Sequence, residues 1–218
     1  MAGLVLDLSN NNLNPNFRLL AEAGVVGVML KVSEGVTFND GVYAGWAARA
    51  RRAGLRVGGY HFAQPDGGDA ILEARHFAKA LGEIQRRDFR PALDLERNGG
   101  HLSWHALESW AHVFSQEVFR LTDTLPMLYA SYGWLRGMEA DYPVGAALWL
   151  AYWSNDGRPF TPPAPAPWKS VHLHQFTSEA TAKSPLHPNG AYGRVDLNQI
   201  LRLRPLLAHP ILGLLPGV

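Results

Sequence analysis

The feature of this sequence that most constrains its fold is an alternation between short β-rich apolar runs and helical patterns. The run at residues 25–32 is continuously apolar, which is typical of a strand buried on both faces. Helical patterns follow several runs and stop at glycines such as Gly24 and Gly54. We expect strands at residues 3–8, 25–32, 55–62, 89–95, 126–130, 147–151, 171–176 and 195–196, and helices at residues 15–23, 39–53, 69–85 and 103–121, the last with Ser103 as N-cap.

This order of elements predicts an α/β fold with a parallel sheet. We expect a single distorted (β/α)8-type barrel, similar to a TIM barrel, with some outer helices missing. The 218 residues lie near the lower end of the size range of such barrels. A doubly wound open sheet is the alternative, although no glycine-rich phosphate motif is present.

The second half of the chain contains weaker helical patterns. Residues 156–168 are rich in proline and therefore predict a loop over the barrel. We expect one catalytic barrel over residues 1–204, followed by an apolar C-terminal tail over residues 205–218 that packs on the barrel surface.

Composition excludes several classes of protein and site. The chain has no cysteine, so disulfides and thiolate metal sites are excluded. The formal net charge is +1 and the basic residues are scattered, so we expect no nucleic-acid partner. No apolar stretch is long enough to span a bilayer, and the first residues lack the charged and apolar regions of a secretory signal. We expect a monomer with no stable membrane insertion and no cofactor or metal.

Acidic residues occur where several expected strands end. Asp7 ends the first, Glu34 follows the second, Asp94 and Glu96 end the run at residues 89–95, and Asp196 ends the last. The C-terminal ends of parallel barrel strands surround one mouth, where active sites are built. These acids are therefore expected to be neighbours in space.

Asp94 and Glu96 are two residues apart, a spacing that places both side chains on the same side of a strand. Two neighbouring carboxylates cannot both ionise freely, so one pKa should rise. A raised carboxyl pKa is what a general acid needs near neutral pH. Aromatic and polar residues that suit sugar rings accompany the acids, and the candidate substrate-binding set with Glu34 is Tyr60, His61, Tyr129, Trp149, Tyr152 and Gln175.

Seven short motifs, in this order and spacing, resemble one known family over residues 4–201. They are Leu6-Asp7-Leu8-Ser9-Asn10, Leu30-Lys31-Val32-Ser33-Glu34-Gly35, Gly58-Gly59-Tyr60-His61-Phe62, Pro91-Ala92-Leu93-Asp94-Leu95-Glu96, Leu148-Trp149-Leu150-Ala151-Tyr152, Gln175-Phe176-Thr177-Ser178 and Val195-Asp196-Leu197-Asn198. The chain is similar to the Chalaropsis-type lysozymes, glycoside hydrolase family 25.

The resemblance implies a distorted barrel that hydrolyses the β-1,4 bond between N-acetylmuramic acid and N-acetylglucosamine in bacterial peptidoglycan. It implies Glu96 as general acid, with Asp94 assisting the substrate's 2-acetamido group. Asp7 and Asp196 would complete the acidic cluster. Tyr60, Tyr129 and Gln175 would line the sugar sites.

Two alternatives remain open at this stage. One is a metal-dependent hydrolase on the same barrel, with ligands among His61, His172 and His174. The other is a wall-binding protein without catalysis. A wall-degrading enzyme without a signal peptide fits a phage endolysin, which would remain in the host cytoplasm until a separate hole-forming protein gives it access to the cell wall.

Overall fold

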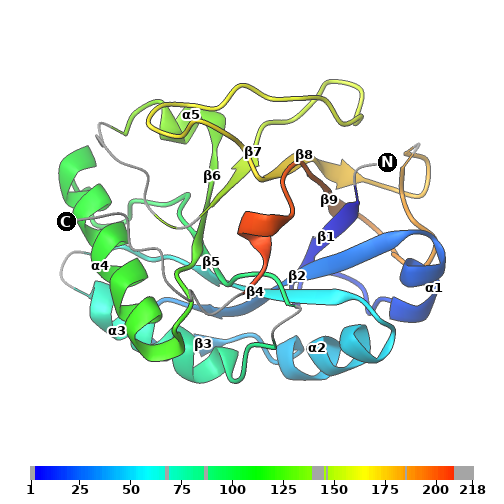
Figure 1. Ribbon diagram of the computed structural model, residues 1–218, viewed down its shortest axis with the longest axis horizontal. Coiled ribbons are helices and arrows are strands. Elements are labelled where there is room, and N and C mark those ends of the chain that lie inside the picture. The colour runs from blue at the N-terminus through cyan, green and yellow to red at the C-terminus, as the bar shows by residue number, and fades with distance from the viewer. Residues whose placement is uncertain are drawn as a thin grey trace.

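Eight strands of the computed structural model close into a barrel (Figure 1). The structure describes residues 3–66, 69–85, 88–138, 145, 147–184 and 186–208. Around the barrel the order is β1, β2, β4, β5, β6, β7, β8 and β9, and β9 pairs with β1 to close it. The strands are β1 (Leu4–Leu8), β2 (Val25–Glu34), β4 (Arg56–Phe62), β5 (Ala92–Asp94), β6 (Met127–Ser131), β7 (Leu148–Ala151), β8 (Leu173–Ala180) and β9 (Val195–Ile200).

The expected barrel is confirmed, but its sheet is mixed rather than parallel. The barrel strands β1, β2, β4, β5, β6, β7 and β8 pair in parallel, whereas β9 runs antiparallel to both of its neighbours. Residues 181–194 carry the chain from β8 to β9 without a helix, apart from the undescribed residue 185, and such direct connections join antiparallel strands. Asp196 therefore lies near the start of its strand and still reaches the mouth.

A second expectation was wrong at residue 39, where a helix was predicted to begin. Residues Phe38–Asn39 form a short strand, β3, that pairs antiparallel with the end of β2. The Asp40 side chain then accepts a hydrogen bond from Val42 N at 3.0 Å, and α2 begins only at Tyr43. A turn stabilised by an aspartate therefore replaces the first turn of the predicted helix.

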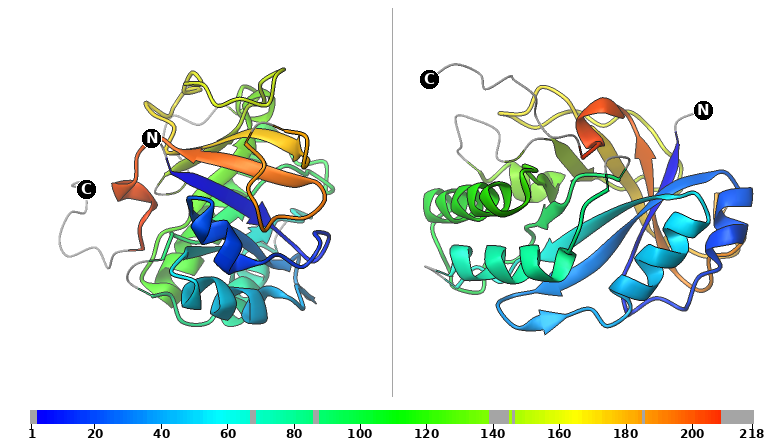
Figure 2. Two further views of the ribbon diagram at one scale, coloured as in Figure 1. Left: turned by 90° about the vertical axis from the view of Figure 1, so that its right-hand side faces the viewer. Right: turned by 60° about the horizontal axis from the view of Figure 1, so that its bottom comes forward.

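Helices cover only part of the barrel, as expected. In Figures 1 and 2 helices α1 to α4 lie along one side, α5 lies apart from them beside β6, and irregular chain covers β7 to β9. Residues 152–172, all of which the structure describes, contain no helix. The Ser103 hydroxyl accepts a hydrogen bond from Ala106 N, which confirms the predicted N-cap. The helices are α1 (Phe17–Glu22), α2 (Tyr43–Arg52), α3 (Ala70–Leu81), α4 (Trp104–Thr122) and the short α5 (Tyr132–Leu135).

The core has two layers, because strand side chains alternate between the barrel interior and the helices. Interior residues include Met29, Met127 and Trp149. Gly58 faces the same space, where a Cβ would collide with the Met29 sulfur. The outer layer joins residues such as Leu30 of β2 and Phe77 of α3 in one buried cluster.

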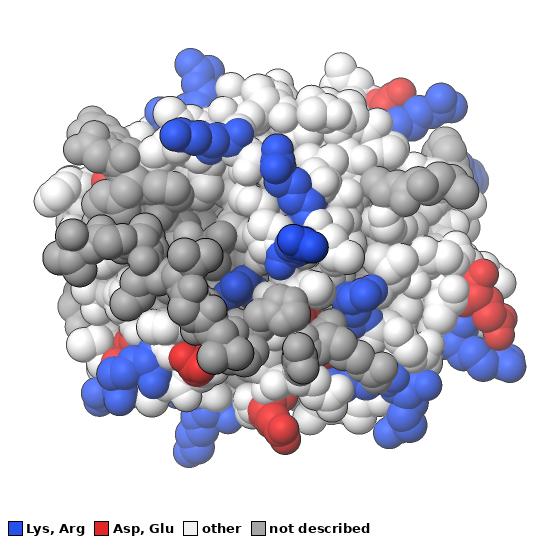
Figure 3. Space-filling model, in the orientation of Figure 1, with Lys and Arg blue, Asp and Glu red and all other residues white. Residues whose placement is uncertain are grey.

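The chain closes the barrel floor at the end opposite the mouth. Leu206, in the 3-10 helix η1 (Arg204–Leu206), packs into the interior cluster, and its carbonyl accepts a hydrogen bond from Arg90 N at 2.7 Å. Ala208 N donates to Asp88 O at 2.9 Å. The predicted tail is thus partly seen against the barrel, and its residues 209–218 lie outside the described part. The face that carries η1 in Figure 1 bears Lys and Arg side chains at several separate points (Figure 3). Within the described residues, no helix is both long and apolar enough to cross a membrane.

Candidate active site

One ring of inward-facing side chains lines the mouth of the barrel. Strand pairing aligns Asp7 of β1 with Asp196 of β9, Gln175 of β8 with Asn198 of β9, and Asp94 of β5 with Tyr129 of β6. Paired residues on neighbouring strands point to the same side of a sheet. The closed barrel therefore brings together acids from the two ends of the sequence.

Asp7 and Asp196 behave as one acidic pair. Burial raises the pKa of both carboxyls, and the charge of Asp7 raises the pKa of Asp196 further. Hydrogen bonds from Asn198 and Gln175 oppose the rise at Asp7. Two adjacent carboxyls of this kind retain one proton between them over a wide pH range, because both cannot ionise freely.

A buried hydrogen-bond network holds Asp7. Its Oδ2 accepts from Asn198 Nδ2 at 2.8 Å and from Gln175 Nε2 at 3.2 Å. Asn198 Oδ1 accepts from Trp149 Nε1 at 2.7 Å, and Gln175 Oε1 accepts from the Tyr129 hydroxyl at 3.1 Å. Asn198 was not among the predicted site residues, although its position two residues after Asp196 on a strand indicates the same face.

Asp94 and Glu96 occupy different environments at the same mouth. Asp94 is 7% exposed, and its Oδ1 has no hydrogen-bond partner among the described residues. Burial and then the charge of Glu96 raise the pKa of Asp94 well above its usual range. Glu96 is exposed, yet the protein around it excludes enough water to raise its pKa, and the charge of Asp7 adds to the rise. Glu96 is thus an accessible acid that holds its proton more tightly than usual.

The buried acids predict that the protein loses stability as pH rises. Because their pKa values are raised, Asp94 and the Asp7–Asp196 pair keep protons in the folded state that the unfolded chain has released above about pH 4. Each group lowers the free energy of unfolding by up to about 1.4 kcal/mol per pH unit until its folded pKa is reached. Thermal melting between about pH 5 and pH 8 should show a falling midpoint, with a shallower slope in Asp196→Asn. Equal slopes in both proteins would contradict the raised pKa of Asp196.

Asn198 is expected to support both the fold and the site. Asn198→Leu keeps a similar volume but leaves the Trp149 indole N–H without its partner and removes one of the two side-chain amide hydrogen bonds to Asp7 Oδ2. One unsatisfied buried polar group costs about 1–3 kcal/mol, so urea denaturation should show at least that loss of stability. Activity of the folded variant should also fall, because Asp7 loses a hydrogen bond that favours its charged form. The exposed Asn189→Leu is the control, and equal stability of the two variants would contradict the network.

Glu34 lies at the rim, but both of its carboxylate oxygens are engaged by protein. Lys31 Nζ donates to Oε2 and Gln64 Nε2 donates to Oε1, each at 2.6 Å. Partial burial alone would raise the pKa of Glu34, but these hydrogen bonds and the charge of Lys31 outweigh it, and the pKa is lowered. Glu34 is thus an ionised partner of Lys31, and neither of its carboxylate oxygens is left without a hydrogen bond.

His61 does not lie at the mouth, in contrast to its predicted place among the substrate-binding residues. It follows the inward-facing Tyr60 on β4, so alternation turns its side chain toward α3 and α4. The ring is fully buried between Phe77 and Phe114 and hydrogen-bonds to Ser33 and Glu73.

The predicted aromatic residues lie at different depths. Trp149 is 2% exposed and lies beneath the acids, in edge-on contact with Tyr60 and Tyr129. Tyr152 is 38% exposed and stacks on Tyr132 with ring centroids 4.7 Å apart. Of this set, Tyr152 is the exposed ring, whereas Trp149 shapes the floor of the mouth.

The histidines of the metal alternative bind separate partners. His172 Nδ1 accepts from Leu148 N at 3.0 Å, His174 Nε2 contacts Tyr152 O at 2.8 Å, and His61 points to the helices. No group of three or more His, Cys, Asp or Glu side chains within the described residues is arranged to hold a metal ion. The structure does not bring the three proposed ligands together.

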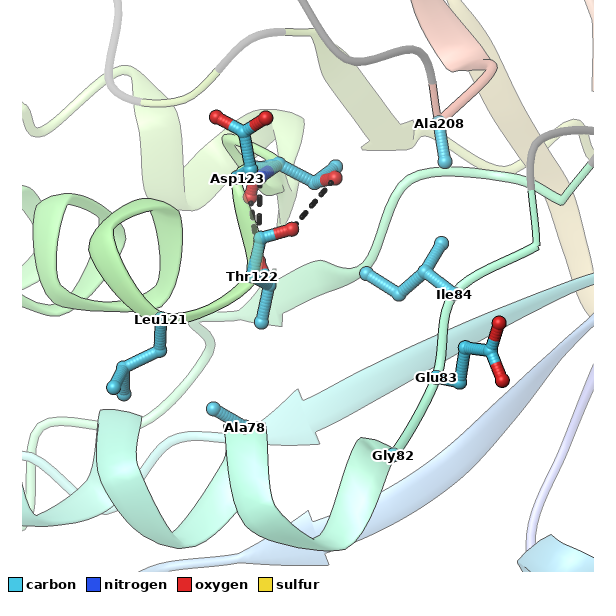
Figure 4. Close-up of a pocket in the computed structure, with 9 residues that line it drawn as sticks. Ala78, Gly82, Glu83, Ile84, Leu121, Thr122, Asp123 and Ala208 are labelled. Atoms are coloured by element: carbon cyan, nitrogen blue, oxygen red, sulfur yellow. Dashed lines mark hydrogen bonds between the residues drawn. The ribbon is translucent and has the colours of Figure 1, made fainter.

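A hollow of about 580 Å³ lies away from the acids (Figure 4). It is lined by the C-terminal ends of α3 and α4, at residues such as Gly82 and Thr122, and by Ala208 from beside the barrel floor. The helices return against the strand direction, so their C-terminal ends lie opposite the mouth. This hollow therefore lies far from the acidic cluster.

Comparisons of the sequence and of the fold with known proteins point to the same family. Residues 6–184 match the family described as Glycosyl hydrolases family 25. The chain is 29% identical over 188 residues to an N,O-diacetylmuramidase of Arthroderma benhamiae, covering 80% of this chain and 79% of that protein.

Two solved structures share the fold over most of this chain. A bacterial lysozyme from Streptomyces coelicolor superposes with a TM-score of 0.82 at 22% identity, covering 92% of this chain and 93% of that one. The catalytic domain of an endolysin from a Listeria monocytogenes bacteriophage superposes with a TM-score of 0.76 at 26% identity, covering 92% and 93%.

Proposed function

The chain belongs to glycosyl hydrolase family 25 and is a glycoside hydrolase, and from this premise we propose that it is a muramidase. Its substrate is bacterial peptidoglycan, and it cleaves the β-1,4 bond between N-acetylmuramic acid and N-acetylglucosamine. The observation that carries the proposal is the pairing of two unlike acids at the mouth. Asp94 is buried with an unpartnered Oδ1, and Glu96 is accessible with a raised pKa.

In the proposed reaction, Glu96 donates its proton to the glycosidic oxygen as the bond from that oxygen to C1 breaks. The carbonyl oxygen of the substrate's 2-acetamido group forms a bond to C1 from the opposite face. Asp94 accepts the acetamido N–H through its free Oδ1 and stabilises the positive charge of the cyclic intermediate. Glu96 then removes a proton from water, which opens the ring at C1. The Asp7–Asp196 pair places negative charge near C1, and the hydrogen bond from Asn198 holds Asp7 in position.

Fragment analysis tests the substrate and the bond. Purified bacterial walls treated with the protein should lose turbidity and yield fragments with muramic acid at the reducing end. Fragments with N-acetylglucosamine at the reducing end would exclude a muramidase but would still show that the protein is a glycosidase.

Product stereochemistry tests the participation of the acetamido group. Two displacements at C1 retain configuration, so proton NMR should first detect the β-anomer. Initial release of the α-anomer would indicate direct attack by water and contradict the role given to Asp94.

We also propose that the enzyme serves the lysis of a bacterial host by a phage. The similarity to a bacteriophage endolysin domain supports this role. In that setting the enzyme would remain in the host cytoplasm until a hole-forming protein releases it to the wall. The genomic neighbourhood tests the idea, because a gene outside any prophage or lysis cassette would contradict it.

A further inference from the structure

A buried chain of hydrogen bonds lies directly behind the mouth. Ser33 Oγ is 2.9 Å from His61 Nδ1, and His61 Nε2 is 2.6 Å from Glu73 Oε2. The His61 and Glu73 side chains are fully buried. Burial lowers the pKa of His61 to about 3 and raises the pKa of Glu73 to about 8. The pair is therefore neutral near pH 7 and shares one proton across a short contact.

This buried pair is connected to the rim through Gln64. Both carboxyl oxygens of Glu73 accept from Gln64 N, at 3.2 and 3.1 Å. The side chain of Gln64 then donates to Glu34 Oε1, and Glu34 Oε2 accepts from Lys31 Nζ. A continuous series of contacts thus runs from α3 to an ammonium group at the mouth.

A bulge in β2 makes this series possible. The pairing of β2 with β4 shifts between Lys31 and Ser33, so that Lys31 aligns with Tyr60 and Ser33 aligns with His61. Strict alternation would have turned Lys31 and Ser33 to the same side. The extra residue turns Ser33 toward the helices and leaves Glu34 level with Phe62, at the rim.

Lys31 is the end of the series that faces the acids. Its side chain is 11% exposed, and Nζ lies 4.8 Å from the centroid of the Phe62 ring. Its positive charge acts on both Asp94 and Glu96, in each case lowering the pKa that burial raises.

We propose that Gln64 is a positioning residue: fixed by the His61–Glu73 pair, it holds Glu34 and thereby directs the Lys31 ammonium toward Asp94 and Glu96. The proposal rests on the muramidase function argued above, because it assigns the charge balance of that same site. The other charged and titratable groups that face the two acids are Asp7 of β1, Tyr60 of β4, Tyr129 of β6, Asp196 of β9 and Arg97.

A double-mutant cycle tests whether Gln64 acts through Lys31. Lys31→Met removes the cation, so the alkaline limb of the kcat profile should move up by as much as about one pH unit. Gln64→Leu keeps its backbone anchor and should move the limb in the same direction by less, with KM nearly unchanged. In the Lys31→Met background, Gln64→Leu should add no further shift.

Additive shifts in the double variant would overturn the proposal, as would a Gln64→Leu profile identical to that of the wild type. Gln116→Leu, an exposed site on α4, is the matched control and should leave the profile unmoved. Thermal melting of each variant separates a shifted profile from loss of fold.

A second readout needs no turnover. NMR titration of the Asp94 and Glu96 side-chain carboxyl carbons in the same four proteins should show the same non-additive shifts. If the wild type cleaves no peptidoglycan, the muramidase proposal fails, while these titrations still decide whether Gln64 controls the charge of the pair. Additive carboxyl shifts would count against the role of Gln64 even in a fully active enzyme.

Discussion

Glu96→Gln is expected to lower kcat on bacterial walls by about 10²–10⁴-fold while leaving wall affinity nearly unchanged. Gln has the shape of Glu but cannot donate a proton to the glycosidic oxygen. Glu96 is exposed, so its replacement should not disturb the core. Turbidity loss with mass analysis of fragments measures the turnover, and co-sedimentation with intact walls measures the affinity.

The control for this substitution is Glu22→Gln, an exposed acid on α1 that makes a loose 3.8 Å ion pair with Arg18. It should clear walls like the wild type. Equal clearing by Glu96→Gln would show that the acid has been assigned wrongly. Binding without clearing by all three proteins would instead favour the wall-binding alternative.

Asp94→Asn is expected to lower activity by about 10²-fold or more and to raise stability near pH 7. The activity falls because a neutral amide cannot stabilise the charge that develops on the acetamido group. The stability rises because the folded wild type holds a buried carboxyl whose pKa is well above its usual range, whereas an amide does not titrate. Urea denaturation should show a gain that grows above about pH 4 by up to about 1.4 kcal/mol per pH unit.

The pH dependence of this gain checks its cause. The raised pKa means that wild-type Asp94 is protonated and neutral in acid, so the advantage of Asn should shrink toward about pH 4. A stability difference that is constant with pH would mean that packing, not charge, separates the two proteins. Activity within tenfold of the wild type would exclude Asp94 from the proposed reaction.

The barrel could be predicted from the sequence because its strands are nearly continuous apolar runs. Residues 25–32, for example, supply both the interior Met29 and the outer Leu30, so both faces of β2 are buried. The nearness of Asp7 and Asp94 followed from strand ends meeting at one mouth. These inferences need only local patterns and one topological rule.

The parts that could not be predicted depend on pairing between distant segments. The direction of β9 follows from the helix-free connection after β8, which has no apolar signature. The bulge at Val32 likewise depends on the pairing of β2 with β4, and the residues of β2 alone do not predict it.

His61 shows a different kind of error, because alternation from the inward Tyr60 does predict an outward side chain. The motif that contains His61 predicts one shared site for its residues, whereas adjacent residues of a strand point to opposite sides. Asn198 is the complementary case, since its parity with Asp196 indicates the mouth.

The closure of the barrel between its first and last strands has a consequence for synthesis. The hydrogen bond from Asn198 to Asp7 spans 191 residues, and contacts of such separation form late and slowly. A nascent chain on the ribosome has Asp7, Asp94 and Glu96 long before β9 exists to close the sheet beside them. The proposed site therefore lacks Asp196 and Asn198 until β9 has been translated, and a fragment that ends before β9 is expected to be inactive.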